Sequence, residues 1–249
     1  MTGGIAVVGL GPGPDGWLTP ETRDALAEAS DLIGYAPYLV RVPDRPGLVR
    51  HPSDNRVELD RARHAFALAA AGRSVAVVSG GDPGIFAMAA AVIEALEDGE
   101  AGWTDVPLRV LPGVSAMQAA AARLGAPLGH DFCVIFLSDN LKPWDIIARR
   151  LVAAAAGDFV LAIYNPASSL RPGQLDDAFA LLRENKAGDT PVAFARAIGR
   201  PGEALHVTTL AEAEGGRADM STLVIVGSSE TRLVAGRWLL TPRSYGRRA

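Results

Sequence analysis

The sequence has very little cysteine and few aromatic residues. Cys133 is the only cysteine among 249 residues, so the chain can form no internal disulfide, which is typical of proteins from a reducing compartment. Cys133 lies in the apolar segment DFCVIF, and we expect it to be a buried structural thiol. Aromatic residues make up 6% of the chain and hydrophobic residues 49%, which predicts an α/β protein rather than a disordered or fibrous one.

Long apolar runs and an excess of basic residues are also missing. The longest apolar segments are much shorter than the ~20 residues that span a bilayer, and no secretory leader pattern begins the sequence. We therefore expect a cytoplasmic protein with no membrane partner. The formal net charge is −4, which argues against nucleic acid as a partner, because sequence-independent binding needs a basic face.

Common metal-binding and catalytic motifs are absent as well. The histidines occur singly, without H-E-x-x-H or paired-cysteine spacing, so we expect no bound metal; they are His51, His64, His130 and His206. The sequence contains no G-x-S-x-G motif and no Walker A lysine. These absences exclude the common hydrolase and P-loop classes.

Short apolar segments of strand length alternate with alanine-rich helical patterns. Apolarity is continuous within these segments, which predicts strands covered on both faces by helices. The predicted strands are residues 5–9, 74–79, 108–111, 132–138, 159–164, 191–195 and 222–227. The predicted helices are residues 21–29, 59–71, 85–96, 114–124, 144–155 and 174–184. Thr19 before Pro20 predicts a helix start, and Gly72 predicts a helix end.

Glycine and proline cluster in GAPLGHD, residues 125–131. This composition predicts a domain boundary, which gives two α/β lobes, residues 1–125 and 126–249. Small-ligand sites commonly lie in clefts between such lobes.

The opening segment VVGLGPGPDG, residues 7–16, contains the pattern G-x-G-x-x-G. In a dinucleotide-binding fold this loop leads directly into a helix whose free N–H groups hold the pyrophosphate, and a carboxylate ends the second strand. Here Pro12 and Pro14 have no N–H to donate, and the predicted helix begins only at Pro20. The second strand, DLIG, is followed by YAPY without a carboxylate. The loop is therefore either a different ligand loop or a tight turn that binds nothing.

Three further predicted strands end in comparable loops, SGGDPGIF, LPGVSA and IYNPAS. Glycines let a ligand approach the backbone, and Asp82 can accept hydrogen bonds from a hydroxyl or an ammonium group. Each loop alone is equally typical of a simple turn or helix cap. Because open α/β sheets bind ligands beyond the carboxyl ends of their strands, the four loops together predict one binding site.

Five segments in this order resemble the tetrapyrrole methyltransferases, the class III S-adenosylmethionine (SAM) enzymes of cobalamin and sirohaem biosynthesis. They are VVGLGPGPDGWLTPET, SGGDPGIFAM, LPGVSAMQAAAARLGAPLGHDF, IYNPAS and DMSTLVIVG, and the resemblance spans essentially the whole chain. Within the family, IGYAPYL, LSDNLKPW and YNPAS look most like the ring-contracting C17-methyltransferases of the cobalamin pathway. Uroporphyrinogen methyltransferases have an aspartate after the tyrosine of the second strand, where this chain has Ala36.

The resemblance implies two α/β lobes with mixed sheets flanked by helices, SAM in a cleft between the lobes, and a homodimer. Carried over residue by residue, it implies that the cofactor contacts Leu10, Pro12, Gly80, Gly81, Asp82, Ile85, Ser115, Ala116 and Asn165. It also implies that Ala197 or Ile198, together with Thr222, closes the adenine pocket.

The activity implied by the resemblance is methylation of the tetrapyrrole precorrin-3B at C17, with ring contraction to precorrin-4. Ring contraction needs proton transfers, and the candidate acid or base groups are Asp139 and Lys142. Tyr35, Tyr38 and Tyr164 are candidate hydrogen-bond donors at the same catalytic site. A surface role for Asp139 and Lys142 is an equal alternative. Precorrins carry many carboxylates, so we expect basic residues near the site, with a solvated surface as the alternative; they are Arg41, Arg45, Arg50, Arg56, Lys142 and Arg171.

Three alternatives stay open. The substrate could be cobalt-factor III of the anaerobic route. Cobalt would be bound by the substrate, so the absence of a metal-binding motif in the protein does not distinguish the two routes. The methyl group could also be transferred to an acceptor other than a tetrapyrrole, as in the related diphthine or ribosomal-RNA methyltransferases. The chain could also bind SAM or a tetrapyrrole without catalysis, because catalysis by positioning needs few diagnostic residues.

Overall fold

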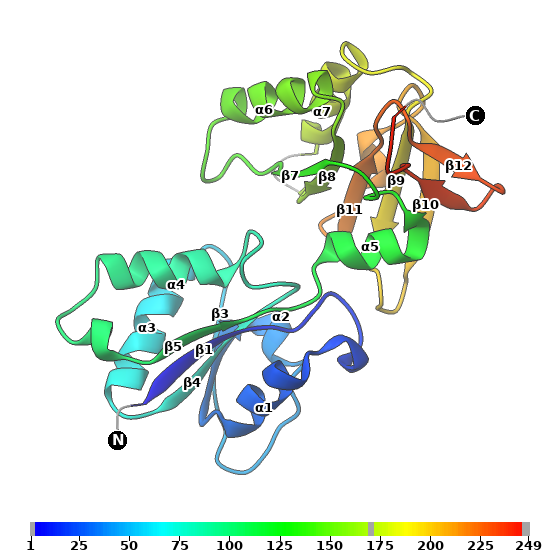
Figure 1. Cartoon of the computed structure of the whole chain (residues 1–249). Helices are drawn as coiled ribbons and strands as arrows, with labels where there is room; N and C mark the ends of the chain where they lie inside the picture. The colour runs from blue at the N-terminus through cyan, green and yellow to red at the C-terminus, as the bar shows by residue number, and fades with distance from the viewer. Residues whose placement is uncertain (1–2, 169–171, 246–249) are drawn as a thin grey trace. The chain divides into compact units, whose positions relative to one another are not determined.

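The computed structural model describes residues 3–168 and 172–245 (Figure 1). The chain divides into two compact units, of which the first ends at Ser115 and the second begins at Ala116. In the part of the chain that is described, every helix is too short or too polar to cross a bilayer.

The N-terminal unit is built on a five-stranded sheet in the order β3-β2-β4-β1-β5. Every pairing in it is parallel, so all its strands end at the same edge, termed here the N-terminal carboxyl edge. The strands are β1 (Gly4–Gly9), β2 (Asp31–Tyr35), β3 (Val49–Ser53), β4 (Ser74–Ser79) and β5 (Leu108–Leu111).

Helices cover both faces of this sheet, as its continuous apolar strands predict. In β1, Ile5 and Val7 pack into a core with residues of α3 and α4, whereas Ala6 and Val8 pack into a second core with residues of α1 and α2. The helices are α1 (Pro20–Glu28), α2 (Ala36–Leu39), α3 (Glu58–Ala70) and α4 (Met88–Glu97), with 3-10 turns at Asp15–Trp17 and Trp103–Asp105.

Two of these helix ends follow the sequence signals predicted for them, and one helix start differs from its prediction. The Thr19 hydroxyl accepts the N–H of Thr22 (3.1 Å), which confirms the predicted start of α1. Gly72 follows α3 with a φ of +88°, which confirms the predicted glycine stop. Helix α4 begins at Met88, later than the predicted start at residue 85, because Phe86 has a φ of +53° that no α-helix can include.

The C-terminal unit contains a mixed five-stranded sheet in the order β10-β9-β11-β8-β7, which confirms the expected α/β class. Strands β7 and β8 are parallel, whereas β11 is antiparallel to both β8 and β9, and β10 is antiparallel to β9. The strands are β7 (Phe132–Phe136), β8 (Val160–Tyr164), β9 (Pro191–Arg196), β10 (Ala204–Thr209) and β11 (Thr222–Val226). Cys133 in β7 is half-buried against the core, and burial raises the pKa of its thiol.

Helices α6 (Trp144–Ala156) and α7 (Gln174–Arg183) pack on this sheet around a core that includes Leu151, Phe179 and Phe194. A 3-10 turn at Gly215–Arg217 contacts α7.

A small second sheet and helix α5 (Ala116–Leu124) complete the C-terminal unit. Helix α5 contacts β11 and β6, so it belongs with the C-terminal unit. For this reason the structural division precedes residues 125 and 126, where the sequence places it. The small sheet consists of β12 (Arg232–Val234), β13 (Trp238–Leu240) and β6 (Gly125–Ala126).

Candidate functional site

The loops after β1, β4 and β5 extend from the N-terminal carboxyl edge, and their backbones contact one another. The N–H of Gly11, after β1, donates to the carbonyl of Gly81, after β4 (3.1 Å). A Cβ atom on Gly113, after β5, would lie 2.5 Å from the Gly81 oxygen, and a Cβ atom on Gly9 would lie 2.6 Å from it. Because these contacts are to backbone, a side chain at Gly9 or Gly113 would force the loops apart.

The Asp82 carboxylate ties the loop after β4 to the loop after β5. Its Oδ1 accepts the N–H of Gly84 (2.8 Å), and its Oδ2 accepts the N–H of Gly113 (3.0 Å). Bonds from backbone N–H groups to a carboxylate are charge-assisted and strong. Asp82, which the sequence suggested as a ligand contact, therefore also shapes the loops.

The backbone at Gly81 is less crowded than that at Gly9 and Gly113. A Cβ atom on Gly81 would meet no atom closer than 4.0 Å, although its φ of +70° still favours glycine. The other predicted cofactor positions in this unit range from buried (Leu10 and Ser115) to partly buried (Pro12, Gly80 and Ile85). At this edge, a ligand would therefore meet the Gly81 backbone and side chains that are buried or only partly exposed.

Two tyrosines adjoin the same loops. A Cβ atom on Gly80 would lie 2.7 Å from the Tyr38 ring, so the phenol packs directly on the Gly80 backbone. Tyr35, a predicted hydrogen-bond donor of the catalytic site, is half-buried at the end of β2 and packs edge to face on Tyr38, with 5.4 Å between the ring centroids.

A second group of predicted positions meets at one edge of the C-terminal sheet, termed here the Tyr164 edge. Strands β7 and β8 end there at Phe136 and Tyr164, which are paired. Strand β9 ends there as well, beside the start of β11, since Arg196 pairs with Thr222. Because β11 is antiparallel to β8, its start also lies beside the end of β8.

Two residues at the Tyr164 edge have left-handed backbone conformations without being glycine. Asn165 follows β8 with a φ of +50°, and Ala197 follows β9 with a φ of +48°. The N–H of Ala197 donates to the carbonyl of Ser221 (2.9 Å), which fixes this turn against the start of β11. Such strained positions concentrate in ligand-binding loops, and both residues were predicted as cofactor contacts.

The Tyr164 hydroxyl accepts the N–H of Met117 (3.0 Å), in the first turn of α5. This bond holds the predicted cofactor position Ala116 near the end of β8. The first N–H groups of a helix have no partner within the helix, and Tyr164 takes one of those of α5.

Asp219 joins the ends of β9 and β11. Its Oδ1 accepts the Thr222 hydroxyl (2.8 Å), and its Oδ2 accepts the Nε–H of Arg196 (2.8 Å). Burial raises the pKa of Asp219, but the bonds from Thr222, Arg196 and the Ser221 N–H outweigh burial and hold the pKa below its ordinary value. The predicted cofactor position Thr222 is thus fixed by a carboxylate.

Lys142 and Asp139, the two acid-base candidates, lie in the loop after β7. The Lys142 amine donates to the carbonyl of Phe136 (2.8 Å), at the Tyr164 edge. Burial, with a smaller effect of Arg150, lowers the pKa of Lys142, which makes its neutral form easier to reach. The Asp139 side chain is exposed. Within residues 3–168 and 172–245, no three His, Cys, Asp or Glu residues are grouped to hold a metal ion.

Residues 4–214 match the family described as Tetrapyrrole (Corrin/Porphyrin) Methylases. The chain belongs to this family. A precorrin-3B C(17)-methyltransferase from Sinorhizobium sp. is 58% identical to this tetrapyrrole methylase over 98% of both chains. A probable cobalt-factor III C(17)-methyltransferase from Salmonella typhimurium is 41% identical over 97% of this chain and 99% of its own. The crystal structure of the methyltransferase CobJ is 52% identical, covers 96% of this chain and 100% of that one, and has a TM-score of 0.94.

In this tetrapyrrole methylase, three of the arginines expected near the substrate have their guanidinium groups on backbone carbonyls of the N-terminal unit. Arg41 donates to Leu10, Gly11 and Gly13, Arg45 donates to Leu26 and Ala29, and Arg50 donates to Leu39 and Val42. Of the other candidates, Arg56 is exposed, Lys142 faces Phe136, and Arg171 lies outside the described residues. Sequence reasoning missed these contacts because a basic residue near a glycine loop is as typical of anion binding as of carbonyl binding.

Proposed function

We propose that this tetrapyrrole methylase is a SAM-dependent precorrin-3B C17-methyltransferase of cobalamin biosynthesis, which methylates C17 and contracts the ring to give precorrin-4. The observation that carries the proposal is the 58% identity, over almost the whole of both chains, to a protein of that name. The loops at both sheet edges, where the predicted cofactor positions gather, support it further.

The backbone and the small side chains at these two edges are suited to binding SAM. A Cβ atom on Gly81 would meet no atom closer than the Val114 oxygen at 4.0 Å, so this backbone is more accessible to a ligand than that at Gly9 or Gly113. At the Tyr164 edge, the left-handed turns at Asn165 and Ala197 place backbone groups and small side chains beside the buried Thr222, which suits a flat adenine ring. We propose that both groups of positions bind SAM.

When bound, SAM supplies an electrophilic methyl group, so the main task of the protein is to hold the acceptor carbon in line with it. Such positioning supplies roughly 7–11 kcal/mol of the barrier in well-oriented reactions. Loops fixed by backbone contacts, as at Gly11 and Gly81, and by Asp82 suit this task because their geometry is set before the substrate binds.

Ring contraction also moves protons, and we propose Lys142 as the residue best suited to accept one. Its lowered pKa favours deprotonation, and its place at the Tyr164 edge puts it near predicted cofactor positions. Tyr164, Asp139 and Tyr35 remain proposals for hydrogen bonding to the substrate or for proton transfer.

We further propose a cytoplasmic homodimer whose partner is the small tetrapyrrole substrate, without nucleic-acid or membrane binding. The single cysteine supports the compartment, and the net charge of −4 supports the absence of nucleic-acid binding. The homodimer is proposed from the resemblance to the family. Light scattering after size exclusion tests the dimer, because a mass of one chain would contradict it.

Incubation of the purified protein with SAM and either precorrin-3B or cobalt-factor III tests the activity. We expect S-adenosylhomocysteine and a methylated product with a changed absorption spectrum from precorrin-3B. Product from cobalt-factor III alone would assign the chain to the cobalt-dependent route, whose named relative is 41% identical. Binding of SAM without product from either substrate would contradict the proposed activity and indicate a binding protein.

A further inference from the structure

We propose that Arg41 is a positioning residue that sets the conformation of the opening loop, Leu10–Pro14, for cofactor binding. The inference rests on the proposed function only in assigning this loop to SAM. The contacts that carry it are hydrogen bonds within the N-terminal unit.

A single guanidinium gathers three carbonyl groups of the opening loop. Its Nη2 donates to the oxygens of Leu10 and Gly13 (2.8 Å each), and its Nη1 donates to the oxygen of Gly11 (2.9 Å). Three carbonyl dipoles that converge on one point repel one another unless a cation lies there. The planar arginine fork, with several donors in fixed directions, suits this arrangement better than a lysine ammonium.

The composition of the loop makes these bonds important. Pro12 and Pro14 have no N–H, so the loop cannot be held by a regular ladder of backbone bonds. Its N–H contacts to β4 and the β4 loop come from Leu10, which donates to Ser79 (2.9 Å), and from Gly11, which donates to Gly81 (3.1 Å). Arg41 therefore holds the carbonyl groups of the opening loop, and the N–H groups of Leu10 and Gly11 are held by β4 and the loop after it.

Arg41 is itself anchored at a defined point. Its own N–H donates to the carbonyl of Tyr38 (3.1 Å), in the last turn of α2, and the ring of Tyr38 packs on Gly80. Through Arg41, the end of α2 thus connects the opening loop to the loop after β4. Because both loops carry predicted cofactor positions, a change at Arg41 acts on the site without a contact between Arg41 and the cofactor.

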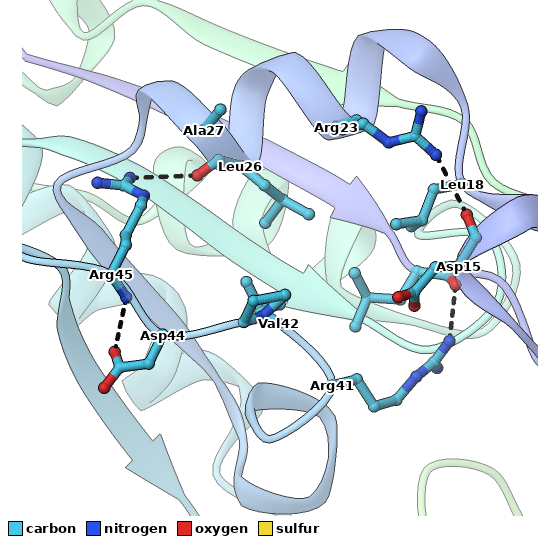
Figure 2. A pocket seen from close by; sticks show the side chains of 11 residues that line it. Asp15, Leu18, Arg23, Leu26, Ala27, Arg41, Val42, Asp44 and Arg45 are labelled. Carbon is cyan, nitrogen blue, oxygen red and sulfur yellow. Dashed lines mark hydrogen bonds between the residues drawn. The ribbon is translucent and has the colours of Figure 1, made fainter.

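Arg41 also lines a cavity of the N-terminal unit. A cavity of about 340 Å³ lies between α1 and residues 41–45, with Leu10, Leu18, Leu26 and Val42 among its lining residues. Figure 2 shows the Arg41 side chain extending along this cavity toward the opening loop, with Arg45 directed to the end of α1. An apolar side chain of similar length at position 41 would leave the cavity lining intact and remove the bonds.

Arg45 provides a matched control. It belongs to the same segment, lines the same cavity and also donates to backbone carbonyls, those of Leu26 and Ala29 at the end of α1. It does not bond to the opening loop. Arg50 is less suitable because it holds the carbonyls of Leu39 and Val42, on either side of Arg41.

The first test measures the opening loop without any ligand. Hydrogen exchange of a peptide that includes the Leu10 and Gly11 amides is compared among the wild type, Arg41→Met and Arg45→Met. We expect exchange in this peptide to be about tenfold faster in Arg41→Met alone. The bonds from Arg41 to the loop carbonyls stabilise the folded loop, so their loss makes the local opening that exposes its amides more frequent. Equal exchange in the wild type and Arg41→Met would overturn the proposal.

The second test measures S-adenosylhomocysteine binding by calorimetry. We expect Arg41→Met to raise Kd by about tenfold or more, Arg41→Lys to give a smaller increase, and Arg45→Met to leave Kd within about twofold of wild type. Equal losses in the two methionine variants would overturn the proposal, because they would indicate a general loss of stability. If the wild type does not bind S-adenosylhomocysteine, the proposed function fails, whereas the exchange result still decides the role of Arg41 in the loop.

Discussion

The two units hold their candidate loops by different means. At the N-terminal carboxyl edge, backbone meets backbone at Gly9, Gly81 and Gly113, and side chains add bonds to main-chain atoms. At the Tyr164 edge, the side chains of Tyr164 and Asp219 accept hydrogen bonds that hold the start of α5, the end of β9 and the start of β11. The first arrangement has no room for added atoms at Gly9 and Gly113, whereas the second depends on polar groups that can be removed singly.

In the N-terminal unit, the buried carboxylate of Asp31 lies at the end of the sheet opposite the loops that contain the predicted cofactor positions. Asp31, at the amino end of β2, accepts bonds from Arg73 Nε (2.7 Å), the Ser30 hydroxyl (2.7 Å) and His51 Nε2 (2.9 Å). Burial raises the pKa of Asp31, but these three bonds outweigh burial and hold the pKa below its ordinary value of 3.8. In a parallel sheet this position is opposite the carboxyl edge, so stability and ligand binding can be changed separately in this unit.

The largest expected effect follows from adding one carbon atom to the N-terminal loops. In Gly113→Ala, the new Cβ would lie 2.5 Å from the Gly81 oxygen, so the loops must separate. We expect a loss of about 3 kcal/mol in the free energy of unfolding and a fall of more than about tenfold in S-adenosylhomocysteine affinity. Urea unfolding and calorimetry measure the two effects.

Gly16→Ala is the control for this change. A Cβ atom on Gly16 would meet nothing within 4 Å, although the residue belongs to the same opening segment. We expect both quantities to stay at their wild-type values. If Gly113→Ala behaved like Gly16→Ala, the loops would be more adaptable than close backbone contact allows.

The second effect separates stability from binding within one unit. Asp31→Asn removes the charge that holds Arg73 and His51, and we expect a loss of about 2 kcal/mol at pH 7, because the partly exposed Arg73 keeps some hydration. The charged Asp31 contributes stability above its unfolded-state pKa, about 3.8, and this contribution is lost as the pH falls through the lower folded-state pKa. The stability difference between wild type and variant should therefore shrink in acid.

Affinity for S-adenosylhomocysteine at pH 7 is the second measurement on Asp31→Asn. We expect it to match the wild type, because Asp31 lies at the end of the sheet opposite the loops. A parallel loss of affinity would show that the two ends of the N-terminal sheet are coupled.

Local patterns in the sequence were sufficient for most of the fold. Continuous apolar runs identified the buried strands, and Thr19 and Gly72 marked helix ends, because these signals act within a few residues. Strand β3, VRHPS, and strand β10, ALHVTT, were not predicted because they lie at sheet edges and contain no continuous apolar run of strand length.

The candidate site was predictable as a set of loops but not as a set of contacts. Glycine and proline at strand ends indicated where the chain needs unusual backbone, and the resemblance to a family supplied the ligand. The partners of Arg41, about thirty residues away, and the bond between Tyr164 and Met117 depend on how distant segments pack. No local pattern specifies such a partner, so Arg41 and Tyr164 were assigned to substrate chemistry alone. Whether the predicted residues contact SAM stays a prediction.

The smallest effect concerns the side-chain bonds at the Tyr164 edge. Tyr164→Phe removes the acceptor of the Met117 N–H, and we expect a loss of about 1 kcal/mol, because the partly buried N–H can then bond to water. Thermal unfolding and steady-state kinetics measure the outcome, with kcat expected to stay within about threefold of wild type and KM for SAM to rise. A fall in kcat far beyond this range would assign the hydroxyl to proton transfer. Unchanged stability would mean that backbone pairing holds this edge too, and the contrast between the two units would no longer stand.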